Sequence, residues 1–183
     1  MNKKKLIYQI LLGTLYAVLV FFFLAESLKD ATSSSESSKG LTDVVTSIVD
    51  NIKPGGNGGG GNASHIPTVE EQQAYNNFHL LVRKGIGHFG FFFVLGGISS
   101  LFYYSFMKEK RWYIWVIINL VAGIALAFIS EFVCQNMAKG RYPSMKDVGI
   151  DSFGFIVSFL TITIIYLLIL KRRKKKKDLI EEE

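Results

Sequence analysis

The residues of this sequence whose types suit chemistry lie in two short stretches next to long apolar segments. The stretch 131–151, EFVCQNMAKGRYPSMKDVGID, carries carboxylates, an amide, a guanidinium and a hydroxyl, and the stretch 83–89, RKGIGHF, carries two cations and a histidine. We call the following set the polar cluster: Arg83, Lys84, His88, Glu131, Gln135, Arg141, Ser144, Asp147 and Asp151. Groups of these types can hold an anion in a guanidinium fork, or move protons between a histidine and a carboxylate.

Helical spacing places members of the polar cluster on common faces. Glu131 and Gln135 stand at i and i+4 and share a face. Ser144, Asp147 and Asp151 follow steps of 3 and 4, and Ser144 is a suitable N-cap for a helix that starts there. Arg83 or Lys84 lies about one turn from His88. Three helices then present polar groups at one membrane depth, where ionisable side chains normally face the bundle interior and mark function.

Four apolar runs must position these groups. The chain of 183 residues is 49% hydrophobic, and the runs cover about 6–25, 86–107, 112–134 and 150–170. Each is long enough to cross the hydrocarbon of a bilayer, which takes about 20 residues. We therefore predict an all-α membrane protein with four transmembrane helices, packed closely through glycines such as Gly85, Gly87, Gly96 and Gly154. Asn119, in the middle of the third run, is expected to make an interhelical hydrogen bond.

The placement of lysine and arginine predicts the orientation. Basic residues precede the first run, fill the turn at 108–111 and form KRRKKKK at 171–177. All three segments lie on one side if the chain crosses four times, so we expect both termini to be cytoplasmic, in a multi-pass protein of the plasma (cytoplasmic) membrane. The first run is longer than a signal-peptide core and is expected to stay as an anchor. The net charge of +6 is explained by this bias, so membrane lipids rather than nucleic acid are the expected partners of the basic tail.

The chain divides into four parts on this basis. Residues 1–25 form the tail and first membrane helix, 26–82 an extracytoplasmic, partly disordered loop, 83–170 a three-helix segment with the polar cluster, and 171–183 a cytoplasmic basic tail. Within the loop, the Ser-rich stretch 33–38 and the Gly-rich stretch 55–61 are expected to be flexible tethers. Helical spacing predicts short helices at 41–52 and about 69–84.

Two blocks of the sequence resemble the VanZ-like family, small bacterial membrane proteins named for a teicoplanin-resistance accessory protein. The first block is R-K-x-x-x-H-F at 83–89, followed by Leu95-Gly96, and the second is E-x-x-x-Q-x-x-x-x-x-R-x-x-S-x-x-D-V-x-x-D-x-x-G at 131–154. The chain departs from the family at Gly90-Phe91-Phe92, where an acidic residue often follows His-Phe, and at Asp151, where asparagine is frequent. The resemblance implies a cell-envelope protein that lowers susceptibility to teicoplanin-type glycopeptides.

Three hypotheses follow for the polar cluster. In the first, it is a non-catalytic binding site without a metal or cofactor. Arg83, Lys84 and Arg141 hold an anionic group of a lipid, a lipid-linked cell-wall precursor or a glycopeptide antibiotic, and the acidic residues orient them.

In the second hypothesis, the chain is an intramembrane hydrolase or transferase acting on a lipid headgroup. His88 is the base, held by Asp147 or Asp151, and Glu131 is the acid, or His88, Glu131 and Asp151 bind a metal. In the third, the cluster is an internal network in a scaffold protein. We favour the first; the sequence identifies no protein partner.

Overall fold

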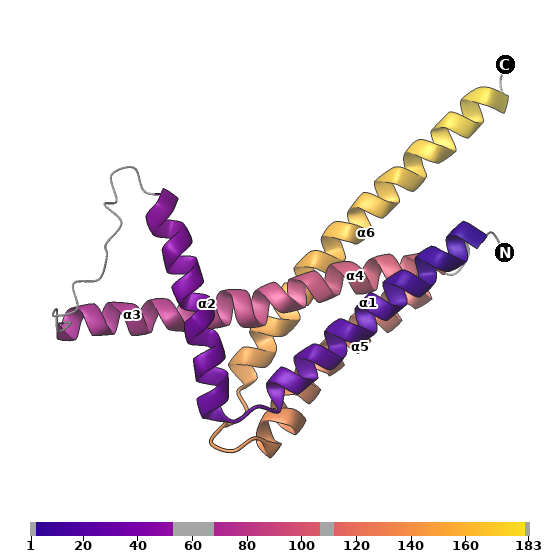
Figure 1. The fold of residues 1–183 in the computed structure, drawn as a ribbon. Coiled ribbons are helices and arrows are strands. Elements are labelled where there is room, and N and C mark those ends of the chain that lie inside the picture. Colours follow the sequence, from indigo (N-terminus) through magenta and orange to yellow (C-terminus); the bar gives the residue numbers. More distant parts are fainter. Residues whose placement is uncertain (1–2, 53–67, 107–111, 182–183) are drawn as a thin grey trace.

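The computed structural model of this chain describes residues 3–52, 68–106 and 112–181, and within them every regular element is a helix (Figure 1). Four helical segments are long and apolar enough to cross a membrane: Lys3–Ser27, Gln72–Ser105, Tyr113–Gln135 and Met145–Arg173. Large apolar side chains on these segments are widely exposed, as expected where lipid covers the protein. The predicted all-α, four-span, multi-pass membrane architecture is thereby confirmed.

The helices form a bundle whose two chain ends lie at the same end (Figure 1). The elements in chain order are α1 (Lys3–Ser27), α2 (Ala31–Ile52), α3 (Val69–Val82), η1 (Arg83–Gly90), α4 (Phe91–Ser105), α5 (Trp112–Ile129), η3 (Ser130–Gln135) and α6 (Met145–Glu181). The segments η1 and η3 are π-helical, and α3, η1 and α4 run on as one rod (Figure 1). Helix α4 packs against α6, α1 and α5 and is the centre of the bundle.

Small residues set the distance between α4 and α6. A Cβ added at Gly96 would lie 2.6 Å from the carbonyl oxygen of Phe155, and one at Gly154 would lie 2.4 Å from that of Phe89. Backbones this close leave no room for a side chain, so the predicted role of these two glycines in helix packing is confirmed. A Cβ at Gly85 or Gly87 would meet nothing within 4 Å, so that prediction is wrong for these two positions.

Aromatic and aliphatic side chains fill the space around these contacts. The fully or nearly fully buried ones in the core are Phe23, Phe92, Leu95, Leu126, Ala127, Val148, Phe155 and Phe159. Neutral polar contacts cross the same region: Asn119 Nδ2 donates to Ser100 Oγ at 3.1 Å, as expected for an interhelical amide, and Tyr104 hydrogen-bonds to Thr163. The middle of the bundle is therefore apolar with a few uncharged crosslinks.

The Ser-rich stretch 33–38 is helical, so its prediction as a flexible tether is wrong. It lies in the first half of α2, whose first turn is capped by Asp30 Oδ1, which accepts from the Ser33 amide at 2.9 Å. Ser38 Oγ donates to the Ser34 carbonyl at 2.8 Å, so this serine satisfies its hydroxyl within the helix. The prediction from composition failed here because the Asp30 cap and packing against a neighbouring helix outweigh the low helix propensity of serine.

That neighbour is α3, which packs on α2. Tyr75 donates to Asp43 Oδ1 at 3.2 Å, and His79 Nε2 lies 3.2 Å from Ser38 Oγ. The predicted helices at 41–52 and 69–84 are present as part of α2 and as α3 with the start of η1. The Gly-rich stretch 55–61 lies outside the described residues.

Candidate functional site

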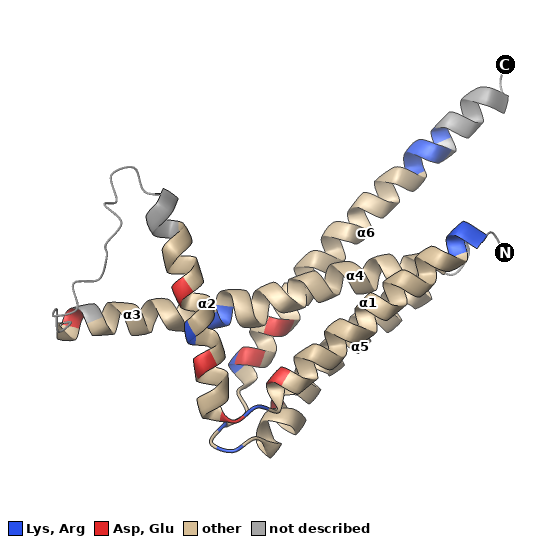
Figure 2. Ribbon diagram, viewed as in Figure 1, with Lys and Arg blue, Asp and Glu red and all other residues tan. Residues whose placement is uncertain are grey.

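The polar cluster assembles where α1 ends and α6 begins, which we call the polar end of the bundle. Figure 2 shows acidic and basic residues gathered there, while the helices between it and the chain ends are almost free of charged residues. The cluster residues come from η1, η3 and the loop and first turns of α6. Ser144 Oγ accepts from the Asp147 amide at 3.4 Å, which confirms its predicted capping role.

Two of the three membrane helices that supply the centre of the cluster change to a π-helical path at that point. His88 lies in η1, and Glu131 and Gln135 lie in η3. A π-helical turn carries an extra residue, widens the helix and rotates the side chains after it, and such turns are frequent at functional sites. The backbone is thus irregular where the polar side chains must converge, and regular α-helix elsewhere in these two spans.

His88, Glu131 and Asp151 form a buried inner group. His88 Nδ1 lies 3.1 Å from Asp151 Oδ1 and 3.9 Å from Glu131 Oε1. Gln135 Nε2 donates to Glu131 Oε1, and the Ser144 amide donates to Glu131 Oε2 at 3.3 Å. The expected shared face of Glu131 and Gln135 is confirmed, and of the two aspartates proposed as partners of His88 it is Asp151 that bonds to it.

Lys84 and Asp147 form a separate pair beside the inner group. The Lys84 ammonium donates to Asp147 Oδ1 at 2.9 Å, and the lysine side chain is more than a third exposed. Lys84 was expected to hold an anionic ligand together with the arginines. It instead neutralises Asp147 and does not line the pocket described below.

Arg141 reaches from the loop before α6 to the end of α1. Its Nη1 donates to the carbonyl oxygens of Glu26 and Ser27 at 3.4 and 3.5 Å, and its Nε is buried without a hydrogen-bond partner. Burial lowers the pKa of the Arg141 guanidinium from its usual value, and the nearby positive charge of Arg83 lowers it further. Two cations with spare donors stand close together here, an arrangement that an anion between them would stabilise.

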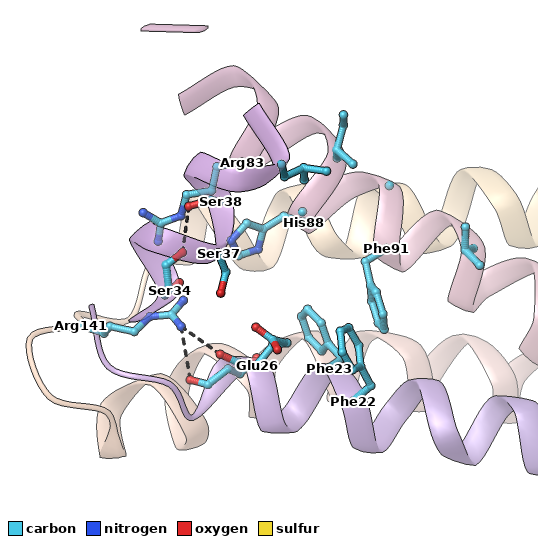
Figure 3. A pocket seen from close by; sticks show the side chains of 16 residues that line it. Phe22, Phe23, Glu26, Ser34, Ser37, Ser38, Arg83, His88, Phe91 and Arg141 are labelled. Atoms are coloured by element: carbon cyan, nitrogen blue, oxygen red, sulfur yellow. Dashed lines mark hydrogen bonds between the residues drawn. The ribbon is translucent and has the colours of Figure 1, made fainter. Parts of the chain in front are cut away.

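A pocket of about 580 Å³ opens beside these two arginines (Figure 3). Its walls come from the end of α1, the start of α2, η1 and the first turn of α4. The apolar lining is Phe22, Phe23, Leu41, Ile86, Phe91 and Val94, and the polar lining is Glu26, Ser27, Ser34, Ser37, Ser38, Arg83, His88 and Arg141. Figure 3 shows Arg83, Arg141 and the serines at one end and the phenylalanines toward the other.

The part of this pocket from α1 and α2 was missed by the sequence reasoning. Ser34, Ser38 and Leu41 stand at i, i+4 and i+7, so they share a face with the apolar residues of the helix predicted at 41–52. This pattern was overlooked because residues 33–38 were predicted to be a flexible tether. Glu26 was assigned to the predicted loop that starts at residue 26, although it belongs to α1, its carbonyl accepts from Arg141 and its carboxylate pairs with Lys29 at 2.6 Å. In all, Arg83, His88 and Arg141 of the polar cluster line the pocket, and the other members lie behind or beside it.

The geometry allows two kinds of chemistry at the polar end. The pocket offers cations at one end and apolar walls at the other, which suits an amphiphile with an anionic headgroup. The inner group offers an oriented histidine, and its ligand-type atoms on His88, Glu131 and Asp151 all lie within 4.8 Å of one another. Comparison of the chain with family models, with curated proteins and with solved structures gives no match.

Proposed function

We propose that this chain is a VanZ-like protein of the bacterial cell envelope that binds an anionic amphiphile in the pocket at its polar end. In this proposal both termini are cytoplasmic, the membrane is the plasma membrane, and the pocket faces the outer side. The ligand is a membrane lipid, a lipid-linked cell-wall precursor or the glycopeptide itself. Binding there lowers susceptibility to teicoplanin-type glycopeptides, which act on the cell wall from that side.

The observation that carries the proposal is the pair of arginines on the pocket wall. Arg141 is half-buried, keeps a buried Nε without a partner, and makes only long bonds to two carbonyl oxygens. Two acidic residues near Arg141 are engaged elsewhere, since Asp147 pairs with Lys84 and Glu26 with Lys29. The guanidinium groups are thus available to a phosphate or carboxylate entering the pocket.

The shape of the lining supports an amphiphile over a small anion. Phe23 and Phe91 stack with ring centroids 4.6 Å apart and, with Phe22, form an aromatic wall. This wall continues from the arginines along α1 and α4 and includes Phe22, which is exposed at the surface. An acyl or prenyl chain along it would bury apolar surface at about 25 cal/mol per Å², while the headgroup stays with the cations.

Binding is tested on the purified full-length protein in detergent. The probe is a short-chain phosphatidylglycerol, with phosphatidylcholine of the same chains as the uncharged comparison, and the readout is the ligand-dependent rise in Tm. We expect the anionic lipid to stabilise the wild type and Arg141→Ala or Arg83→Ala to weaken apparent affinity by about tenfold to a hundredfold, because each loses a charge-assisted hydrogen bond. Lys139→Ala and Lys146→Ala are matched controls, since both lysines are exposed cations of the same region outside the pocket.

The cellular role is tested in a strain that lacks the gene. Complementation uses the wild type, Arg141→Ala or Lys139→Ala, each checked for its level in the membrane, and teicoplanin and vancomycin susceptibility are measured. The proposal expects selective sensitivity to teicoplanin that the wild type and Lys139→Ala rescue and Arg141→Ala does not. Unchanged susceptibility in the deletion strain would reject the resistance role. In the binding experiment, equal binding of both lipids by all variants would reject the pocket as the site that binds an anionic amphiphile.

A second candidate function is a hydrolase or transferase acting on a lipid headgroup. It is favoured by the 3.1 Å contact between His88 Nδ1 and Asp151 Oδ1, together with the position of His88 on the pocket wall. Asp151 would orient the imidazole, His88 would accept a proton from an attacking hydroxyl, and the arginines would stabilise the charge that develops. Release of a headgroup by wild type but not by His88→Gln, with lipid binding retained in both, would establish this function in place of simple binding.

A further inference from the structure

The inner group combines an imidazole and two carboxylates in a geometry that suits a metal ion. His88 comes from η1, Glu131 from η3 and Asp151 from the second turn of α6, so three separate helical segments aim one ligand atom each at a common point. His88 Nδ1 lies 3.1 Å from Asp151 Oδ1 and 3.9 Å from Glu131 Oε1. Ligand atoms bound to one zinc ion at about 2.0–2.2 Å stand roughly 3 to 4 Å apart, so little movement is needed to close the site.

Burial distinguishes this group from a surface patch of acids. Glu131 and Asp151 are 0% exposed and His88 is 7% exposed. Carboxylates taken out of water need a compensating positive charge, and membrane surroundings make that need greater. Neither Lys84 nor Arg141 bonds to these two carboxylates, since Lys84 bonds to Asp147 and Arg141 donates to backbone carbonyls of α1.

An unused acceptor in the group is a second, independent sign of a bound cation. Asp151 Oδ2 is buried and has no hydrogen-bond partner, although Oδ1 of the same carboxylate bonds to His88. Buried carboxylate oxygens normally find a donor or a metal. A divalent ion would also balance the charge, since two carboxylates and a neutral imidazole with one such ion sum to zero.

The surroundings of Glu131 resemble the supporting shell of a metal ligand. Gln135 Nε2 donates to Oε1, and the Ser144 amide donates to Oε2. Such hydrogen bonds fix the orientation of a ligating carboxylate before the ion arrives. Because Gln135 stands one helical turn from Glu131 and Ser144 caps α6, the same contacts tie the site to the backbone of two helices.

We propose that His88, Glu131 and Asp151 hold one divalent transition-metal ion at the polar end of the bundle. The nitrogen and oxygen ligands fit Zn²⁺, and Mn²⁺ shares the preference for carboxylates. Three protein ligands leave a coordination position open, and His88 lies on the wall of the pocket. The ion site does not use Arg83 or Arg141, so metal binding and the binding of an anionic amphiphile can be tested independently.

The experiment measures metal bound to the full-length protein in detergent. Protein is stripped with a chelator, dialysed against Zn²⁺ or Mn²⁺, passed over a desalting column and analysed by elemental mass spectrometry. Co²⁺ loading adds an absorption spectrum that reports a nitrogen and oxygen ligand set. The variants are His88→Gln, Glu131→Gln and Asp151→Asn, which keep the side-chain size, and the matched control is Asp147→Asn, an acid of the same region outside the group.

The wild type and Asp147→Asn are expected to retain about one equivalent of metal, and each of the three ligand variants to lose it by more than tenfold. The metal is also expected to raise the Tm of the wild type, which tests the site without any variant and so does not depend on variants that fold poorly. Wild-type protein that retains no Zn²⁺, Mn²⁺ or Co²⁺ and gains no Tm would overturn the proposal. Metal retained equally by the ligand variants would also overturn it.

Discussion

The apolar middle of the bundle and its polar end both bury polar side chains, but they satisfy them in different ways. In the middle, Asn119 bonds to Ser100 and Tyr104 to Thr163, so neutral groups meet neutral groups and a single amide oxygen is left over. At the polar end, charged groups converge, and the leftover atoms belong to Asp151 and Arg141.

The two regions therefore differ in what their unpartnered hydrogen-bonding atoms can bind. The spare amide oxygen of Asn119 is uncharged and lies outside the pocket. A spare carboxylate oxygen and a spare guanidinium nitrogen, next to a pocket of about 580 Å³, attract ions of opposite charge. The middle holds helices together, whereas the polar end leaves charged hydrogen-bonding groups unpartnered close to a pocket.

The largest expected effect comes from breaking the inner group at the polar end. In chelator-treated protein, Asp151→Ala should lower the free energy of unfolding by about 3–5 kcal/mol, because it leaves the other buried partner uncompensated. The double variant His88→Leu with Asp151→Leu should recover most of that loss. Unfolding in detergent followed by circular dichroism measures both. Losses that simply add in the double variant would mean that the two residues do not act as a pair.

A smaller loss is expected from crowding the contact between η1 and α6. Gly154→Ala places a Cβ 2.4 Å from a backbone oxygen and should cost about 1–3 kcal/mol. Gly149→Ala is the matched control on the same helix, since nothing lies within 4 Å of its Cβ position, and it should stabilise α6 by about 0.5–1 kcal/mol. The comparison is made by thermal unfolding. Equal effects of the two substitutions would show that close backbone approach does not hold these helices.

A still smaller loss is expected from removing a neutral crosslink in the middle. Ser100→Ala deletes the acceptor for Asn119 and should cost about 0.6 kcal/mol, the average for polar contacts between membrane helices. Ser99→Ala is the control, because Ser99 is equally buried and its hydroxyl bonds only to the Gly96 carbonyl of its own helix. Unfolding curves of the two variants should differ by this amount. A cost of several kcal/mol for Ser100→Ala would mean that this neutral crosslink contributes as much to the free energy of unfolding as the charged groups of the polar end.

The smallest effect is expected at the cap of α2, which forms one wall of the pocket. Hydrogen bonds from the Ser33 amide and the Thr32 hydroxyl lower the pKa of Asp30 below its ordinary 3.8. A lowered pKa in the folded state means that the cap is fully formed above pH 3.8 and is lost as the pH falls through the lowered value. The protection of the Ser33 amide against hydrogen exchange, relative to the unfolded chain at the same pH, should therefore fall in that acid range, and at neutral pH in Asp30→Ala.

Asp30→Asn supplies the control for the cap, since asparagine caps helices without titrating. Its Ser33 amide should stay protected as the pH falls. The same acid-dependent loss of protection in Asp30→Asn would show that another group limits the first turn of α2.

Much of the architecture followed from the sequence because membrane spans and helix faces are local properties. Apolar runs of about 20 residues predicted the four membrane helices, and the i, i+4 spacing of Glu131 and Gln135 predicted their shared face. Ser144 and Asn119 were likewise assigned from position alone, and the structure confirms both. Composition misjudged the start of α2, where Asp30 and helix α3 stabilise a serine-rich helix, and the packing roles of Gly85 and Gly87.

Which polar groups meet was decided only by the tertiary structure. The sequence left Asp147 and Asp151 as equal partners for His88, and the choice of Asp151 depends on how η1 and α6 are rotated about their axes. The π-helical turns change that rotation, and no residue pattern in the two segments indicated them. The contact of Arg141 with the end of α1 likewise joins segments more than a hundred residues apart, so only the packing of the helices could bring them together.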